Sequence, residues 1–217
     1  MNHQKVHPIR LFNPLRVITV IGNGKIAATP NYVQLQVEVI TNGKEVSLAA
    51  QENAAIMNRV IQSLIALGIP REDIQTASYN VSPNYDYIEG KQVFRGYEVT
   101  NAITVKVRDM NQVGTVIDTA VKSGANRVSS IQFKIDHEEH YYQQALSLAL
   151  RDAQMKANTI AETMHLTIPP QPIQIFEERT SEPVLYKSAA LASQNFTTPI
   201  EQGLITISAT LRVKFQY

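Results

Sequence analysis

The 217-residue chain contains no cysteine. This absence excludes a disulfide framework, a zinc–thiolate site and a cysteine nucleophile, although it leaves the redox compartment open. An excess of one charge is also missing, because 20 Lys and Arg side chains are balanced by 19 Asp and Glu, for a net charge of +1. Such a chain produces no overall field that would attract nucleic acid or an anionic membrane. We therefore expect no nucleic-acid partner.

No apolar run approaches the roughly 20 residues that a membrane-spanning helix needs, so we expect no transmembrane segment. Residues 1–16 contain basic side chains together with Pro8 and Pro14, but they lack the apolar core of a secretory signal. We interpret them as a flexible leader. If Met1 is the natural start, this composition favours the cytoplasm.

Motifs of catalysis are scarce. The sequence has no Gly-x-Ser-x-Gly nucleophile elbow, and His165 follows a helical pattern, where histidine more often interacts with the helix dipole than acts as a base. The segment 22–27 matches the dinucleotide pattern Gly-x-Gly-x-x-Ala, but Pro30 and the alternation from residue 32 predict a strand instead of the required helix. We therefore predict a glycine-containing strand, no bound cofactor, no catalytic residues and no enzyme activity.

His137 and His140 flank two glutamates and suggest a metal site. The spacing argues otherwise, because the zincin motif places its histidines four residues apart. Asp136 and Glu139 instead form the pattern of an acidic capping box at a helix start. We therefore predict the start of a helix here and no metal.

Two hydrophobic periodicities define the secondary structure. Alternation with a period of two predicts strands at 17–21, 32–40, 74–83, 94–108, 127–135, 173–176 and 205–216. Helical spacing predicts helices at 46–67, 110–122 and 138–164. Gly68 and Asp109 have the residue types of a helix end and a helix cap. We expect strands 17–21 and 32–40 to share one sheet.

The pattern Ile-Pro-x-x-x-Ile-Gln occurs twice, at 69–75 and at 168–174. Each copy follows a helical pattern and opens a strand, so an internal duplication is the simplest explanation. The prediction is an α+β fold with duplicated strand-helix-strand-strand units, a mixed but largely antiparallel sheet and long helices packed on it. Unit one covers about 32–108, unit two about 127–217, and a connector helix lies within 109–124.

Tyrosines gather in the hairpin predicted around Glu89-Gly90. Tyr79, Tyr85, Tyr87 and Tyr97 could form a binding or subunit surface, or they could pack across the strands, and the sequence leaves both explanations open. From this group we select Tyr85, Tyr87 and Tyr97 as the candidate oligomer interface.

The order of these segments resembles the SIMPL-domain family of bacterial proteins over about residues 17–217. The resemblance is carried by 20–24 with Pro30, 66–69 with 73–76, 82–87 with 96–97, Asn101 with 104–109, 124–126, and 199–201 with Gly203. It implies an α+β fold, homo-oligomers, a periplasmic or envelope location and a link to envelope or stress physiology. The family supplies no agreed catalytic residues.

Three hypotheses of function follow. The first is a non-enzymatic, self-associating protein whose sheet edges and aromatic hairpin make subunit contacts. The second is an enzyme or small-ligand-binding protein with a cleft between the two repeats, covered by the hairpin or by 177–202. The third is a peripheral membrane module that uses the basic leader.

Overall fold

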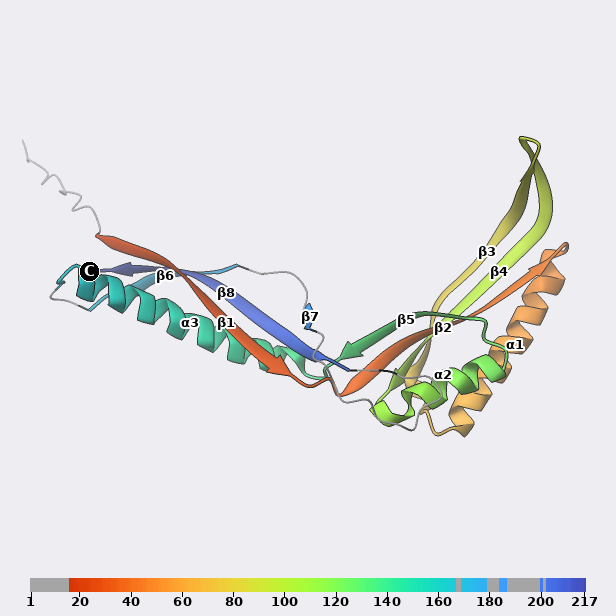
Figure 1. Ribbon diagram of the computed structural model, residues 1–217, viewed down its shortest axis with the longest axis horizontal. Helices are drawn as coiled ribbons and strands as arrows, with labels where there is room; N and C mark the ends of the chain where they lie inside the picture. The colour runs from red at the N-terminus through yellow and green to blue at the C-terminus, as the bar shows by residue number, and fades with distance from the viewer. Residues whose placement is uncertain (1–15, 167–168, 179–183, 187–199, 201) are drawn as a thin grey trace, which may run out of the picture. The chain divides into compact units, whose positions relative to one another are not determined.

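The computed structural model describes residues 16–166, 169–178, 184–186, 200 and 202–217. These residues form two compact units (Figure 1). The first contains the described parts of 1–26, 138–183 and 207–217, and the second contains those of 27–137 and 184–206. In the sequence, most of the second unit therefore interrupts the first. The fold is α+β, as predicted, with antiparallel sheets.

The sheet of the second unit has the strand order β3-β4-β2-β5. Its strands are β2 (Tyr32–Gly43), β3 (Ile74–Ile88), β4 (Lys91–Val107) and β5 (Arg127–Lys134), and all neighbours are antiparallel. Alternation in β2 buries Val33, Leu35, Val37 and Val39 completely. One face of the sheet therefore carries the core.

Two helices, α1 (Val46–Ala66) and α2 (Val113–Lys122), supply the other half of that core. Gly68 follows α1 with a φ of 100°, as a left-handed helix end requires, and the short helix η1 (Arg71–Asp73) then leads into β3. Before α2, the short helix η2 (Met110–Gln112) is capped by Asp109, whose carboxylate accepts the Asn111 amide at 2.9 Å. Both helix boundaries predicted from Gly68 and Asp109 are confirmed.

The sheet that lies mostly in the first unit has the strand order β1-β8-β6. It consists of β1 (Val17–Ala28), β6 (Gln171–Glu178) and β8 (Leu204–Gln216), and β7 (Val184–Tyr186) pairs with the beginning of β8. The 26-residue helix α3 (Glu138–Thr163) packs on β1 and β8. Its buried side consists of alanines at intervals of four residues, Ala145, Ala149, Ala153, Ala157 and Ala161. Side chains this small allow the helix to lie very close to the sheet.

Gly22 and Gly24 show how close this approach is. A Cβ atom at Gly22 would overlap the carbonyl oxygen of Ala149, and one at Gly24 would overlap that of Ala145. The glycines therefore lie within a strand, as predicted, and they are there because the α3 backbone leaves no room for a side chain.

Two expectations about this region are wrong. Strands 17–21 and 32–40 were expected in one sheet, but β1 and β2 belong to different sheets. Alternation identifies the buried face of a strand and carries no information about its neighbour, so the pairing could not be seen. Asp136 was expected to cap α3, but its two carboxylate oxygens accept hydrogen bonds from Lys106 and Arg108, at 2.8 and 3.2 Å.

The two sheets share an arrangement of elements. In the second unit, β2, α1, β3 and β4 follow one another, and β4 lies between β2 and β3. In the first unit, α3, β6 and β8 occur in a similar order, with the short β7 between the last two, but β1 is separated from α3 by the second unit. In the sheet, β8 lies between β1 and β6. Both units therefore share a strand-helix-strand-strand arrangement in space, but only in the second does the helix directly connect two strands that are not neighbours. The strand expected at 127–135 to open the second repeat is β5, and it pairs with β2.

Candidate interaction surface

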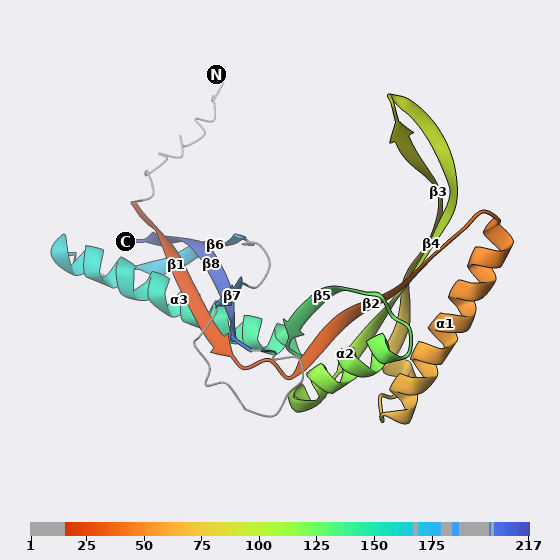
Figure 2. The same ribbon diagram turned by 45° about the vertical axis from the view of Figure 1, so that its right-hand side comes forward.

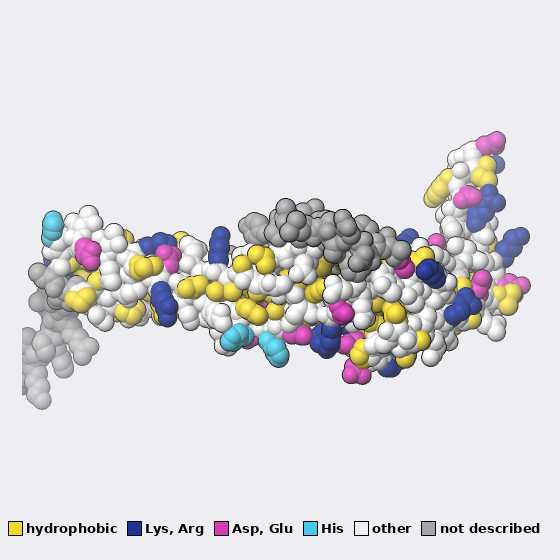
Figure 3. Space-filling model, turned by 60° about the horizontal axis from the view of Figure 1, so that its bottom comes forward, with side chains coloured by type: hydrophobic (Ala, Val, Ile, Leu, Met, Phe, Trp, Pro, Cys, Tyr) yellow, Lys and Arg dark blue, Asp and Glu magenta, His cyan; other side chains and the backbone are white. Residues whose placement is uncertain are grey.

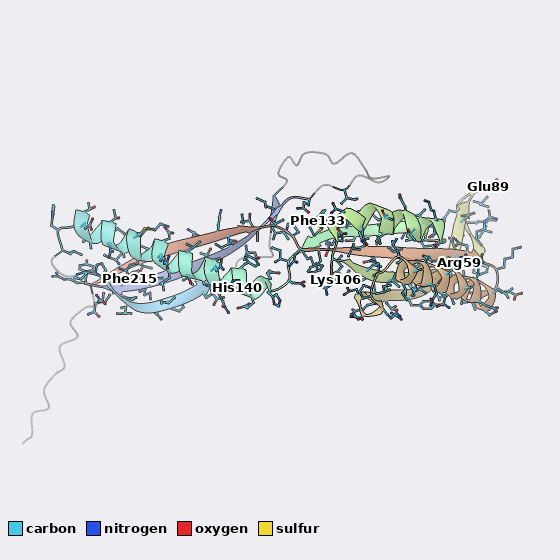
Figure 4. The ribbon with its side chains drawn as sticks, turned by 90° about the horizontal axis from the view of Figure 1, so that it is seen from below. Arg59, Glu89, Lys106, Phe133, His140 and Phe215 are labelled. Atoms are coloured by element: carbon cyan, nitrogen blue, oxygen red, sulfur yellow. The ribbon has the colours of Figure 1, made fainter. Side chains whose placement is uncertain are left out.

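The β3–β4 hairpin extends beyond the part of the sheet that the helices cover (Figures 1 and 2). Gly43, the last residue of β2, pairs with Tyr97, so beyond this position β3 and β4 pair only with each other among the described residues. Its turn consists of Glu89 and Gly90, with φ values of 51° and 78°. Two positive φ angles are typical of a tight two-residue hairpin turn, which confirms the predicted turn at Glu89-Gly90. Figure 4 labels Glu89 at this turn.

Three aromatic rings form a row along one face of the hairpin. The centroids of Tyr85 and Phe94 are 5.6 Å apart, those of Phe94 and Tyr97 are 5.4 Å apart, and both pairs meet edge to face. Tyr85 and Phe94 are 42% and 48% exposed. Edge-to-face packing stabilises the hairpin, but it leaves much of each ring open to solvent. Figure 3 shows hydrophobic side chains on this hairpin, between acidic and basic ones.

Tyr87 is 76% exposed and, by strand alternation, lies on the same face as Tyr85. Nearer the helices, Tyr79 and Val81 also lie on this face, because Val81 pairs with the buried Val99. They are 53% and 38% exposed, and no strand pairs with the outer edge of β3 among the described residues. The hairpin therefore offers a continuous apolar face beside an open strand edge. We call Tyr79, Val81, Tyr85, Tyr87, Phe94 and Tyr97 the hairpin face.

The charged residues of the projecting part of the hairpin are Asp86, Glu89, Lys91 and Arg95. Asp86 and Arg95 form an ion pair in which both side chains are about half exposed. Such a pair contributes little stability, because water screens it. No charged residue occurs from Ile74 to Tyr85, so this stretch of β3 presents neutral side chains to any partner.

Sequence reasoning located Tyr85, Tyr87 and Tyr97 on one structural feature, and the structure brings Tyr85 and Tyr97 together through Phe94. Tyr97 is half-buried and belongs partly to the monomer's own packing. Phe94 and Val81 were missed as members of the surface. The signal that could have found them is the alternation of apolar and polar side chains in the two strands of the hairpin.

The histidines lie elsewhere. His137 has a φ of 60° immediately before α3, and His140 is exposed near the start of the helix, where its ring nitrogen lies 2.9 Å from the amide of Gln144 (Figure 4). Among the described residues, no group of three or more His, Asp or Glu is arranged to hold a metal. The helix start predicted at this point is confirmed, since α3 begins at Glu138.

Two carboxylates in the second unit have lowered pKa values. The hydrogen bond from Lys106 is the main reason that the pKa of Asp136 lies below its ordinary value, and the charge of Arg108 adds to the effect. A hydrogen bond from Ser129 chiefly lowers the pKa of the buried Glu38, which also lies 3.4 Å from Arg127. Hydrogen bonds and a neighbouring cation favour the charged form of each carboxylate, which suits a structural role better than acid–base chemistry.

The first unit contains a shallow, open groove between β1 and α3. It is lined by Val20, Ile21, Met155, Lys156, Thr159 and Ile160. The ammonium group of Lys156 already donates to the Ile21 carbonyl and to Asp152. The groove therefore offers apolar surface without a free charged group to orient a ligand.

Comparison with known proteins identifies the family. The family model described as "SIMPL: Protein of unknown function (DUF541)" matches residues 18–215. The chain belongs to the SIMPL family. This confirms the resemblance found in the sequence, and the family description gives no activity.

Two kinds of relative are similar to this SIMPL protein. A 26 kDa periplasmic immunogenic protein of Brucella melitensis is 26% identical over 215 residues, which cover 92% of this chain and 84% of that protein. The uncharacterized protein YggE of Escherichia coli is 26% identical over 153 residues, covering 70% of this chain and 62% of that protein. Among the described residues, no helix is long and apolar enough to cross a membrane.

Proposed function

We propose that this SIMPL protein is a non-enzymatic protein that associates with copies of itself through the hairpin face. The observation that carries the proposal is the row Tyr85–Phe94–Tyr97 on a two-stranded projection that none of the described helices covers (Figures 1 and 2). The groups that distinguish this surface are aromatic and aliphatic rather than acid–base groups. The proposal therefore assigns it contact and not catalysis.

Physical considerations favour a protein partner for these rings. Tyrosine buries a large ring at a small cost in conformational entropy and keeps a hydroxyl for water or a neighbouring polar group. Each 100 Å² of apolar surface removed from water contributes about 2.5 kcal/mol before the entropic cost of association is subtracted. Several partly exposed rings on one face can therefore hold two protomers together only if they are buried jointly. Continuity of the hairpin face supplies that condition.

The relatives bear on location. Because Brucella proteins similar along most of this chain are named periplasmic, we propose the periplasm or cell envelope as the working place of this protein. The relatives lend no support to the cytoplasm, which was expected only if Met1 is the natural start. A role in envelope or stress physiology, implied by the family resemblance, remains part of the proposal.

The proposal is tested with the double variant Tyr85→Ala and Tyr87→Ala, studied by sedimentation velocity together with circular dichroism. The control is Met155→Ala with Met164→Ala, which removes two exposed apolar side chains, one on α3 and one immediately after its end (61% and 51% exposed). We expect the tyrosine variant to lose the oligomer and keep its secondary structure, and the methionine variant to keep both. An unchanged sedimentation coefficient in the tyrosine variant would remove the hairpin face from the interface.

A further inference from the structure

The strand edges of this protein are protected to different degrees. On the outer edge of β1, the amide of Asn23 donates to Asp152 at 2.8 Å, and the carbonyl of Ile21 accepts from Lys156 at 2.8 Å. Two side chains of α3 thus occupy backbone groups that another strand would need. Blocking of this kind is how proteins prevent unwanted pairing at an edge.

Other edges carry charge. β5 has Arg127 and Lys134 at its ends, and β6 ends in Glu177 and Glu178. Between these charges, β5 and β6 each still have six consecutive uncharged residues, Val128–Phe133 and Gln171–Phe176, but β3 has twelve, from Ile74 to Tyr85, and its outer edge is unpaired among the described residues. A long, neutral, exposed strand edge is a template for adding another strand.

Another strand could be added only along the part of β3 that is regularly paired. The β3–β4 register is interrupted between Thr76 and Ser78, and Pro83, which has no amide hydrogen, lies opposite Tyr97. Between these points, Ser78 to Ser82 pair with β4 without a break. Five residues are therefore available for regular pairing on the outer edge.

From this run we infer that β3 pairs edge to edge with β3 of a second copy, antiparallel and centred on Asn80. The inference rests on the proposed self-association and specifies its geometry. Around this centre, Tyr79 lies opposite Val81 of the second copy, and Val81 lies opposite its Tyr79. Asn80 lies opposite Asn80, and Ser78 opposite Ser82.

The run fits a second copy because it is self-complementary. Tyr79 and Val81 are both exposed on the hairpin face, and an aromatic ring opposite a β-branched side chain is a favourable cross-strand pair. A two-fold axis at Asn80 forms this pair twice, which is the arrangement of an isologous dimer. With no charge in the run, self-pairing brings no like charges together.

Since the chain has no natural cysteine, this geometry can be tested by cross-linking. Antiparallel residues directly opposite each other have Cα atoms about 4.5–5.5 Å apart, within the range that a disulfide bridges. We expect Asn80→Cys to give a disulfide-linked dimer under mild oxidation. The control Gln75→Cys, exposed on the same strand but outside the run, is expected to stay largely uncross-linked. Equal cross-linking at both positions, or none at Asn80→Cys, would overturn the inference.

A charge-swap experiment tests the register without a covalent bond. Asn80→Lys and Asn80→Glu each place two like charges across the axis, and we expect each to weaken association at least about tenfold in analytical ultracentrifugation. A mixture of the two variants is expected to recover association, and Gln75→Lys to leave it unchanged. Failure of the mixture to recover would count against pairing at Asn80.

The two proposals fail in distinguishable ways. If Tyr85→Ala with Tyr87→Ala separates the protomers while Asn80→Cys does not cross-link, the hairpin face is an interface and the edge pairing is wrong. If the unmodified chain is monomeric throughout, both proposals are wrong. Cross-linking at Asn80→Cys that persists in the tyrosine double variant would support the edge pairing and remove the two rings from the contact.

Discussion

Lys156 of α3 donates a hydrogen bond of 2.8 Å to the carbonyl oxygen of Ile21 on the outer edge of β1. Four residues earlier on the helix, Asp152 accepts the Asn23 amide at 2.8 Å and the Lys156 ammonium at 2.7 Å. The Asp152–Lys156 ion pair therefore binds both an amide and a carbonyl group of this strand edge. The consequence is a sheet that is closed to a further strand at β1.

Replacing Lys156 should reopen this edge. We expect Lys156→Met to lower the free energy of unfolding by about 1 kcal/mol, because the Ile21 carbonyl loses its charged donor. Urea denaturation measures the change. Lys25→Met, at an exposed position of the same strand, is the control and should stay within about 0.5 kcal/mol of the unmodified protein. Equal effects of the two substitutions would show that the Ile21 contact contributes nothing specific.

Asp152 gives this contact a pH dependence. The hydrogen bond from Lys156, and then the one from the Asn23 amide, lower the pKa of Asp152 below the ordinary value of 3.8. Because the folded-state pKa is the lower one, the stabilisation is fully present above pH 3.8 and is lost as the pH falls through the folded-state value. In acid titrations followed by circular dichroism, Asp152→Asn should lose less stability below about pH 4 than the unmodified protein. Parallel acid curves would contradict this assignment.

The glycines of β1 give a second stability prediction. We expect Gly24→Ala to cost about 1–3 kcal/mol, because its methyl group would overlap the Ala145 carbonyl and push α3 away from the sheet. Ala27→Val adds volume at an exposed position of the same strand and should cost much less. Thermal denaturation of the two variants checks the difference. A Gly24→Ala protein as stable as the control would mean that α3 can shift freely.

Asn53 connects α1 to the centre of the second sheet. Its side-chain amide is fully buried and donates to the carbonyls of Val39 and Val99, at 2.8 and 3.0 Å. Replacement by Leu leaves both carbonyls without this donor, so we expect a loss of about 1–3 kcal/mol in urea denaturation. Asn58→Leu, exposed on the same helix, is the control. A stable Asn53→Leu protein would show that the strand hydrogen bonds alone satisfy the two carbonyls.

The local structure was largely predictable from the sequence, and the pairing of strands was not. The alternation in β8 and the helical spacing of α1 are local signals, and both elements lie where they were expected. The partner of β1 is β8, almost the whole chain away, and no local pattern records such a contact. The Gly22-x-Gly24 pattern likewise indicated a strand, but the reason for the glycines is visible only once α3 lies against it.

The internal duplication remains a prediction. Of its two Ile-Pro turns, the first lies between α1 and β3 with Ile69 buried, and Ile168 lies outside the described residues. The shared strand-helix-strand-strand arrangement supports the idea in a changed form, because β1 holds the place that was expected for the strand at 127–135. The sequence shows the repeated helix and the strands that follow it. The strand that completes each unit, however, need not come directly before the helix in the chain.

The candidate site was predictable only in part for a related reason. Tyrosines at alternate positions of a hairpin indicate one face, and this placed Tyr85 and Tyr87 correctly on the same side. Whether such a face is covered depends on where α1 begins relative to the end of β2. That relationship involves Gly43 and Tyr97, which are paired in space but far apart in the chain.

Sedimentation velocity of the unmodified chain over a range of concentrations tests self-association most directly. The protomer has a mass of 24.2 kDa. The hairpin face predicts a heavier species whose population rises with concentration and falls in the Tyr85→Ala, Tyr87→Ala variant. A single 24.2 kDa species at every concentration would contradict the account.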